Sequence, residues 1–378
     1  MKIFKKILLG LLALIVGLTL YLVLFFQLAP QLGGEASGER LNRIQQADNY
    51  KDGVFVNTIE TQMEMTWETM KKTLSHYLFE DKTFKSPQVQ IQTQPFDRTN
   101  HEAAETLNEL TVTWFGHSSI LITLDGLNIL TDPILVGQRA SMFSLMGPLR
   151  FDYSEHISLD QLPQIDAVII SHDHYDHLDY PTIRDLNGKV DKFFMPLGVG
   201  AHFAEWGIPE EDIIELEWWD EVEFGGLTMA LTPMRHFSGR GLTDRFKTLW
   251  GSWVLIGETQ RIFFSGDGGY FPGFKEIGDT YGPFDLTFME CGAYDEGWSD
   301  IHMFPEETAQ AHLDVQGELL MPIHWGKFDL ALHDWKDSVE RLTAKAEEEN
   351  IALFTPEVGQ TITVQSNPAT SYWWEAYE

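Results

Sequence analysis

Residues 171–179, with the sequence SHDHYDHLD, gather three histidines and three aspartates in one short segment. An apolar, β-branched run directly before them predicts a buried strand, so the segment is expected to form the loop at the end of that strand. Histidines two residues apart in an extended segment project to the same side, which places His172 and His174 to bind one metal ion. Asp176 and His177 lie on the following turn, where they can face a second ion. A single histidine in a loop is usually solvated, but this spacing after a strand indicates a metal site.

Three more candidate ligands follow predicted strands further along the chain. The predicted strands and the residues after them are 165–170 with the segment above, 227–234 with His236, 261–264 with Asp267, and 319–323 with His324. Because side chains at the carboxyl ends of strands collect along one rim of a sheet, we expect these residues to converge. Together they supply five histidines and two aspartates, a number that fits two metal ions.

Composition excludes several classes of partner. The chain has 378 residues with 43% hydrophobic content, enough for one large domain or two ordinary ones. Its formal net charge of -31 argues against binding nucleic acid, which needs basic patches, and against electrostatic adhesion to an anionic membrane. A single cysteine, Cys291, excludes an intrachain disulfide and a thiolate metal cluster. The sequence has no G-x-S-x-G motif, the mark of one class of serine hydrolase.

The N-terminus predicts a membrane anchor. Lys2, Lys5 and Lys6 precede the uncharged, apolar run 7–26, which is long enough for a helix to cross a bilayer. The run exceeds an ordinary signal-peptide core, so we expect it to stay uncleaved, with cleavage near residues 33–37 as the alternative. The lysines favour the cytoplasmic side, which would place the rest of the chain on the extracytoplasmic, periplasmic side.

Three regions are expected. Residues 1–28 form the anchor or signal segment, 29–108 a linker and N-terminal extension, and 109–378 the catalytic domain. Within the extension, apolar residues at three- and four-residue steps predict one helix over 61–78, packed on the domain or on the lipid surface. The stretches 29–60 and 80–108 are polar and irregular, and no regular element is expected in them.

The catalytic domain should begin with a strand meander. The predicted strands are 111–115, 118–124 and 127–131, with a hairpin turn at Asp125-Gly126. The long loop 135–157, which includes Met142 and Phe143, is expected to be a packed excursion or a lid. Asp179 before Tyr180-Pro181 predicts a helix start. Further helices are predicted over 305–313 and over 334–349, the second with Asp334 as its N-cap.

Seven short segments resemble the metallo-β-lactamase superfamily, and within it the bacterial relatives of the N-acyl-phosphatidylethanolamine-hydrolysing phospholipase D family. They are TWFGHSS at 113–119, TDP at 131–133, SHDHYDHLD at 171–179, RHFSGR at 235–240, SGD at 265–267, H-x-x-x-E at 302–306 and MPIHWG at 321–326. They cover about residues 110–330 in the expected order. Sugar-phosphate lactonases are similar in much of the same skeleton, so the resemblance is more specific for the superfamily than for the substrate.

The resemblance implies an α/β fold, a four-layer αββα sandwich, with a binuclear site that usually holds two zinc ions. By the family pattern, His172, His174 and His236 would bind one ion, and Asp267 would bridge both. Asp176, His177 and His324 would bind the other. Imidazole and carboxylate ligands suit Zn²⁺, and iron or manganese would accept the same set. Two ions about 3.5–4 Å apart would activate a bridging water that attacks phosphorus or a carbonyl carbon.

Further residues are candidates for catalysis and substrate binding. Asp176, Asp267 and His302 are the catalytic candidates. By the resemblance, His302 would protonate a leaving group or bind phosphate, and a structural role at the helix over 305–313 is the alternative. Arg240 would pair with a substrate phosphate or form an ordinary salt bridge. Lys327 stands where the branch often has threonine.

Four more residues are candidates around the ligands. Met142, Phe143 and His117 are candidates for substrate contact, and His117 is expected behind the ligands rather than among them. Asp179 would support a metal ligand from behind by hydrogen-bonding its free imidazole N–H. Asp173 would do the same or be solvated at the surface.

The resulting expectation is a membrane-anchored, metal-dependent hydrolase of phosphodiesters. The resemblance favours an N-acyl-phosphatidylethanolamine-like lipid as substrate, cleaved by a phospholipase D type reaction to phosphatidic acid. One alternative is a hydrolase of lactones or other carboxylic esters, with a small soluble substrate at the same site. The other is a non-catalytic, membrane-tethered binding protein that uses the fold as a scaffold, which the complete ligand set argues against.

Overall fold

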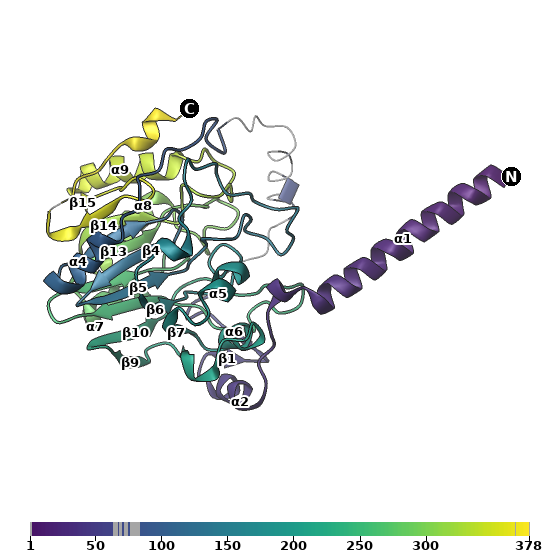
Figure 1. Ribbon diagram of the computed structural model, residues 1–378, viewed down its shortest axis with the longest axis horizontal. Helices are drawn as coiled ribbons and strands as arrows, with labels where there is room; N and C mark the ends of the chain where they lie inside the picture. Colours follow the sequence, from purple (N-terminus) through teal and green to yellow (C-terminus); the bar gives the residue numbers. More distant parts are fainter. Residues whose placement is uncertain are drawn as a thin grey trace.

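The computed structural model describes residues 2–62, 67, 70, 71, 75, 84–366 and 368–377. Two seven-stranded sheets lie face to face in the body of the protein (Figure 1). The first sheet, in spatial order, consists of β16 (Thr361–Thr363), β3 (Thr111–Trp114), β4 (Ile120–Leu124), β5 (Leu127–Thr131), β6 (Ile165–Ile169), β7 (Val190–Pro196) and β8 (Ile213–Leu216). The second consists of β15 (Ala352–Leu353), β14 (Gly317–Ile323), β13 (Phe284–Glu290), β12 (Arg261–Phe264), β11 (Ser252–Ile256), β10 (Leu227–Thr232) and β9 (Glu221–Phe224).

Each sheet is mixed. Strands β5 to β8 are parallel to one another, as are β12 to β15, and the remaining pairs are antiparallel. Parallel strands need crossover connections, which bring their carboxyl ends to the same edge of the sheet. Candidate ligands that follow β6 therefore meet those that follow β10, β12 and β14 across the two facing sheets.

Helices cover the two outer faces. The helices over the first sheet are α4 (Thr99–Leu107), α5 (Tyr180–Leu186) and α6 (Gly200–Glu205), and those over the second are α7 (Gly273–Tyr281), α8 (Pro305–Asp314) and α9 (Asp337–Glu349). The central strands of both sheets are buried on both faces. Along β4, Ile120 and Ile122 point into the core between the sheets, whereas Leu121 points to the helices outside. This period of two is what a doubly covered strand requires, and it confirms the four-layer αββα sandwich.

The predicted strands are found with ends shifted by at most two residues, but four helices, α2 (Gly38–Gln46), α4, α6 and α7, were not expected. Helix α4 lies in a stretch predicted to be irregular, and so does α2. Both bury few apolar side chains, so neither has a clear helical period in its sequence. The prediction of Asp334 as an N-cap was wrong, because α9 begins at Asp337. The helix predicted over 61–78 lies for the most part outside the described residues.

The N-terminal region joins a projecting helix to the body. Helix α1 (Lys2–Leu28) extends away from the two sheets (Figure 1), and its apolar part is long enough to cross a membrane, by length and composition. After it, η1 (Pro30–Leu32) and α2 return to the body, where Arg40 pairs with Glu215 at 2.7 Å. A two-strand hairpin, β1 (Tyr50–Lys51) and β2 (Val54–Phe55), follows. The three-region division remains a prediction, although residues after the anchor pack on the body.

Candidate metal centre

The structure brings all seven predicted ligands together between the ends of the two sheets. The loop after β6 supplies four of them, and the loops after β10, β12 and β14 supply one each. Five of these side chains are buried, and those of His174 and Asp176 are half-buried. The seven are His172, His174, Asp176, His177, His236, Asp267 and His324. Their role as ligands remains a prediction, which the geometry below supports.

One group consists of His172, His174 and His236. The Nε2 of His172 lies 2.9 Å from the Nδ1 of His174, and the Nε2 of His236 lies 3.3 Å from the same nitrogen. The Nδ1 of His236 donates to the carbonyl of Ile301 at 2.9 Å, so the Nε2 of its neutral ring carries a lone pair. The Nδ1 of His172 is held in the same way by Ser171 Oγ at 2.9 Å, because that hydroxyl donates its own proton elsewhere. The Nε2 lone pairs of His172 and His236 therefore converge on His174, an arrangement that can bind one cation between the three rings.

A second group surrounds Asp176. Its Oδ2 lies 3.2 Å from the Nε2 of His324, 3.5 Å from the Nε2 of His177 and 3.1 Å from the Nε2 of His117. His117 was expected behind the ligands, but the structure places its ring nitrogen among them. This group therefore offers three imidazoles and one carboxylate, a donor set that can hold an ion.

Asp267 lies between the two groups. Its Oδ2 is 3.0 Å from the Nε2 of His177, 2.9 Å from the Nε2 of His324 and 3.9 Å from the Nε2 of His172. The position is the one a carboxylate needs to contact ions in both groups. Its Oδ1 is buried without a hydrogen-bond partner among the described residues.

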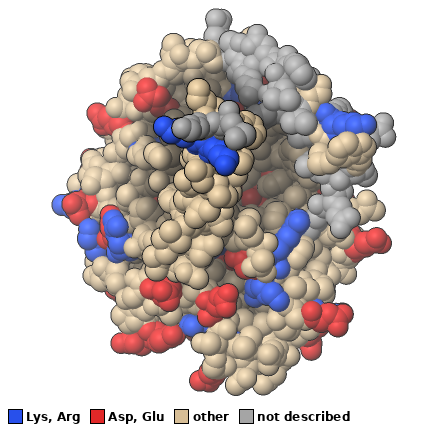
Figure 2. All heavy atoms as spheres, turned by 90° about the vertical axis from the view of Figure 1, so that its right-hand side faces the viewer, with Lys and Arg blue, Asp and Glu red and all other residues tan. Residues whose placement is uncertain are grey.

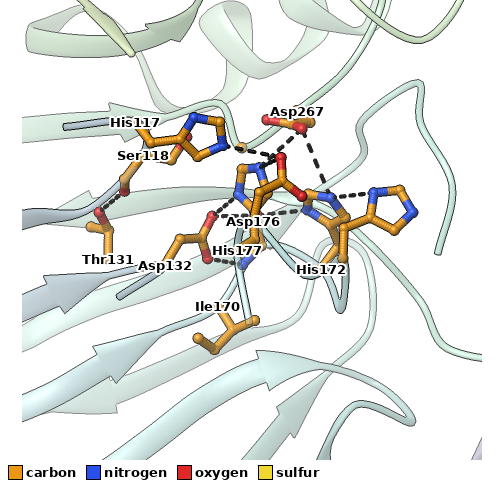
Figure 3. A network of polar contacts seen from close by, with 12 residues as sticks. His117, Ser118, Thr131, Asp132, Ile170, His172, Asp176, His177 and Asp267 are labelled. Carbon is orange, nitrogen blue, oxygen red and sulfur yellow. Dashed lines mark hydrogen bonds and ion pairs between the residues drawn. The ribbon is translucent and has the colours of Figure 1, made fainter. Parts of the chain in front are cut away.

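The tautomer of His177 tests whether a cation fits here. Its Nδ1 donates to Asp132 Oδ2 at 2.7 Å, so in the neutral ring the Nε2 lone pair faces the carboxylates of Asp176 and Asp267 (Figure 3). That nitrogen makes no hydrogen bond to a described residue. Acceptors that face one another in a buried site are repulsive unless a positive charge lies between them. Nitrogen and oxygen donors without sulfur fit Zn²⁺, and also iron or manganese.

The pKa values of His177 and Asp267 are shifted by the charges of the groups around them. Burial lowers the pKa of His177, but the carboxylates of Asp267, Asp176 and Asp132 outweigh it and raise the pKa well above its usual value. Burial raises the pKa of Asp267, but His177 and His324 outweigh it and lower the pKa well below its usual value. The pocket therefore favours positive charge strongly, whether as protons on the rings or as metal ions.

Two buried acids that sequence reasoning did not single out hold the rings in place. Asp132 follows β5, and its carboxylate accepts hydrogen bonds from the His177 ring, from Ser171 N at 2.8 Å and from Ser171 Oγ at 2.6 Å (Figure 3). Glu290 ends β13, and its Oε1 lies 2.9 Å from the Nδ1 of His302. Both are acids at the end of an otherwise buried strand, and that position was the available signal. Such carboxylates fix the tautomer and orientation of a ring.

His302 lies beside the ligands rather than at a helix end. Its ring forms a group with His236 and Asp267, and its other nitrogen is held by Glu290. Its side chain is partly exposed, whereas that of Glu290 is fully buried. The arrangement leaves one ring nitrogen free to carry a proton toward the metal groups.

Asp179 does not support a metal ligand. Its Oδ2 accepts hydrogen bonds from Thr182 N, Thr182 Oγ1 and Gly137 N, and it caps the N-terminus of α5. The carboxylate at a helix start is drawn to free N–H groups, and this took precedence over the ring contact we expected. Asp173 is buried and accepts from Thr248 Oγ1 at 2.7 Å and Gly239 N at 2.7 Å, so it is not solvated.

Arg240 is not placed to bind a substrate phosphate. The side chain is buried, and four of its five N–H groups donate to backbone carbonyls. These carbonyls belong to Gln31, Asp173 and Leu178. The guanidinium instead ties the segment after α1 to the loop that carries the central motif.

Met142 and Phe143, two of the candidates for substrate contact, lie beside the N-terminal helix, whereas Lys327 lies in the core. Phe143 stacks on Phe25 of α1 with ring centroids 5.0 Å apart, and the Met142 carbonyl accepts from Gln31 Nε2 at 2.7 Å. Lys327 is buried and donates to the carbonyls of Phe115 and Ile134. Burial lowers the pKa of Lys327 to about 7. These contacts give Lys327 a structural role, and they place Met142 and Phe143 against the N-terminal helix.

Three residues of the centre have left-handed backbone conformations. His117, Asp132 and His324 have φ values of 56°, 34° and 68°. Such angles are uncommon for residues other than glycine, and they occur where surrounding structure enforces a special orientation. Residue type alone does not predict them, because histidine and aspartate adopt this conformation more often than most residues but still only in a minority of cases.

Comparison with known proteins agrees with this geometry. Residues 127–325 match the model of the beta-lactamase superfamily domain. An uncharacterized protein of Mycobacterium tuberculosis is 41% identical over 347 residues, 91% of each chain. The N-acyl-phosphatidylethanolamine-hydrolyzing phospholipase D 1 of Caenorhabditis elegans is 34% identical over 269 residues, 66% of this chain and 75% of the relative.

A solved structure supports the fold. A metallo hydrolase from the archaeon Ignicoccus hospitalis matches with a TM-score of 0.51 and 21% identity, covering 67% of this chain and 97% of the other. At this identity the match concerns the fold alone. The family match spans half of the chain and includes the loops that carry the candidate ligands. The chain belongs to the metallo-β-lactamase superfamily and is a metal-dependent hydrolase.

Proposed function

We propose that this protein is a binuclear, membrane-anchored phosphodiesterase that cleaves N-acylated phospholipids in a phospholipase D type reaction. The observation that carries the binuclear part is the position of Asp267 between two imidazole groups. His172, His174 and His236 would hold one ion, and Asp176, His177 and His324 the other. Two divalent ions, zinc by the donor set, would supply Lewis acidity and lower the pKa of a bound water.

The chain's own residues would then orient the substrate and move protons. Asp132 keeps the Nδ1 proton on His177, so that its Nε2 stays available as a ligand. His302, oriented by Glu290 at 2.9 Å, is placed to give a proton to the leaving alcohol. No serine or cysteine nucleophile is required. Cys291 is buried, with its thiol 3.5 Å from the Ser338 carbonyl, away from this role.

Three observations support a lipid substrate and a membrane location. Relatives in Caenorhabditis elegans and Saccharomyces cerevisiae are named as N-acyl-phosphatidylethanolamine-hydrolyzing phospholipases D. Helix α1 is long and apolar enough to span a bilayer. The lysines at its start favour the cytoplasmic side, which would place the metal centre on the extracytoplasmic side. Removal of residues 1–28 should release the protein from membranes, and a truncated chain that stays membrane-bound would contradict the anchor.

Metal analysis and paired assays test the proposal. Purified full-length protein should contain about two metal ions per chain, the number of the two-metal mechanism. It should hydrolyse bis-(p-nitrophenyl) phosphate and N-acyl-phosphatidylethanolamine faster than simple lactones. His172→Ala and Asp267→Asn should abolish turnover while the fold persists, and Lys275→Gln, at an exposed ion pair on α7, serves as the control. Hydrolysis of lactones without hydrolysis of phosphodiesters would reject the phosphodiesterase activity. One metal ion per chain would reject the binuclear centre.

A further inference from the structure

A hairpin next to the anchor has an unusual apolar tip. Residues 139–150 fold back on themselves, with Arg139 paired to Leu149 and the Ala140 N–H donating to the Pro148 carbonyl at 3.1 Å. Arg139 also donates to the carbonyl of Gly147 at 2.6 Å, which closes the turn. The hairpin is therefore held together by hydrogen bonds within the segment itself, from its backbone and from the Arg139 guanidinium.

Three large apolar side chains of the tip are exposed. Leu145 is 87% exposed, Met146 61% and Leu149 51%. Residues 140–149 contain no charged side chain, although the chain as a whole carries a formal charge of -31. Contiguous apolar groups that point into water indicate an interaction surface. The two arginines that bound this stretch, Arg139 and Arg150, would lie at the level of lipid headgroups if the tip entered a bilayer.

The hairpin contacts the end of the membrane helix. Phe143 stacks on Phe25 in the last turn of α1, and the Met142 carbonyl accepts from Gln31 Nε2. Figure 2 looks at the face from which α1 projects, and most acidic groups visible there lie toward its rim. The tip thus continues the apolar surface of α1 at the point where the helix meets the body. This continuity identifies the bilayer, rather than a protein partner, as the occupant.

The same contacts connect the anchor to the metal loop. Gln31 lies three residues past α1, and its carbonyl accepts from the Nε and Nη2 of Arg240 at 3.0 Å and 2.8 Å. Arg240 Nη1 donates to the carbonyls of Asp173 and Leu178, on either side of the ligands Asp176 and His177. Two hydrogen bonds therefore separate the exit of the anchor from the metal loop.

We propose that the hairpin tip, residues 142–149, inserts into the interfacial region of the bilayer that α1 crosses and holds the metal centre against the membrane surface. A short apolar tip of this kind reaches the boundary between headgroups and acyl chains. The inference rests on the membrane anchoring of the proposed function, but not on its phosphodiester substrate.

A label at the tip tests the insertion directly. The full-length chain with Leu145→Cys, in phosphatidylcholine nanodiscs, is labelled with an environment-sensitive fluorophore. Cys291 is buried and will not react under native conditions. The label should show blue-shifted emission, protection from aqueous iodide, and quenching by lipids that carry a nitroxide near the headgroup. Leu107→Cys is the matched control, because Leu107 is 64% exposed at the end of α4. Equal iodide quenching at both positions would overturn the proposal.

A kinetic comparison tests the second half of the proposal. The double variant Leu145→Asp, Met146→Asp should raise the KM for a vesicle-borne phosphodiester about tenfold, because charge opposes interfacial insertion. Its kinetics with soluble bis-(p-nitrophenyl) phosphate should not change. Unchanged kinetics with vesicles would overturn the claim that the tip holds the centre at the membrane. If the parent protein cleaves no phosphodiester, the proposed function fails, while the fluorescence result still decides the insertion.

Discussion

The substitution Asp132→Asn isolates the carboxylate behind the candidate metal ligands. Asp132 accepts from Ser171 N on Oδ1 and from the His177 Nδ1 on Oδ2. An asparagine has only one oxygen, so it must turn its NH₂ group toward one of these two donors. If the NH₂ group faces Ser171 N, two hydrogen-bond donors face each other, because a backbone N–H cannot act as an acceptor. If it faces His177, the ring proton must move to Nε2, and the ligand lone pair is lost.

The expected loss follows from the bond that one orientation must give up. A hydrogen bond to a charged group is worth about 1.5–3 kcal/mol, and the variant loses at least one in either orientation, because Oδ2 also accepts from Ser171 Oγ. If the lost hydrogen bond is the one that keeps the proton on His177 Nδ1, metal binding should weaken by about 10- to 100-fold. Removal of the hydrogen-bond partner of a metal ligand typically has an effect of this size. Turnover at saturating metal should fall less than turnover at limiting metal.

Competition with a chelator of known affinity, followed by metal analysis, measures this change in binding. Asp179→Asn is the matched control, because all three hydrogen bonds of Asp179 are accepted by one oxygen, which asparagine keeps. The control should bind metal like the parent, and circular dichroism should show both variants folded. Parental metal affinity in folded Asp132→Asn would refute the role assigned to this acid.

Three further outcomes are expected. Dialysis against a chelator should abolish activity and lower the melting temperature, because ligands that bind only the folded state stabilise it; restoration of both by added Zn²⁺ is the check, and an active metal-free protein would contradict the mechanism. Arg240→Met should lower the free energy of unfolding by about 3 kcal/mol or more, since buried carbonyls left without donors cost about 1–3 kcal/mol each; denaturant titration measures this, and parental stability would disprove the structural role. Burial lowers the pKa of Lys327 to about 7, whereas an unfolded lysine titrates near about 10.4. Between these values the unfolded chain binds the extra proton, so stability rises with pH. The free energy of unfolding of Lys327→Met, taken relative to that of the parent, should therefore fall from pH 7 to pH 10, and a difference that stays constant would contradict the shift.

The sequence alone determined seven of the described strands, β3, β4, β5, β6, β10, β12 and β14, and the residues that follow them. Apolar runs of four to eight residues gave β5, β6, β12 and β14, because strands buried on both faces leave a continuous apolar signal. The spacing in residues 171–179 indicated a metal site, since two histidines at i and i+2 on an extended chain share one side. The family resemblance then supplied the αββα arrangement, which the structure confirms.

Elements with little apolar periodicity could not be predicted in the same way. Helix α4 buries His101 and Ala104. The two ring nitrogens of His101 form hydrogen bonds with Thr113 Oγ1 at 2.8 Å and with Thr123 Oγ1 at 2.7 Å. Those partners are distant in sequence, so no local pattern contains them. The start of α9 was misplaced for a related reason, because several acids lie near it and any of them could cap a helix.

Only the tertiary structure decided what each polar residue contacts. Asp179 and Asp132 are both aspartates just after a buried strand or its loop, yet one caps a helix and the other holds a metal-loop imidazole. Arg240 appeared suited to phosphate, but the carbonyls around it, brought together from two segments, occupy its donors. Residue type and spacing fix which bonds a side chain can make, whereas the partner depends on which distant segments the fold brings within hydrogen-bond distance.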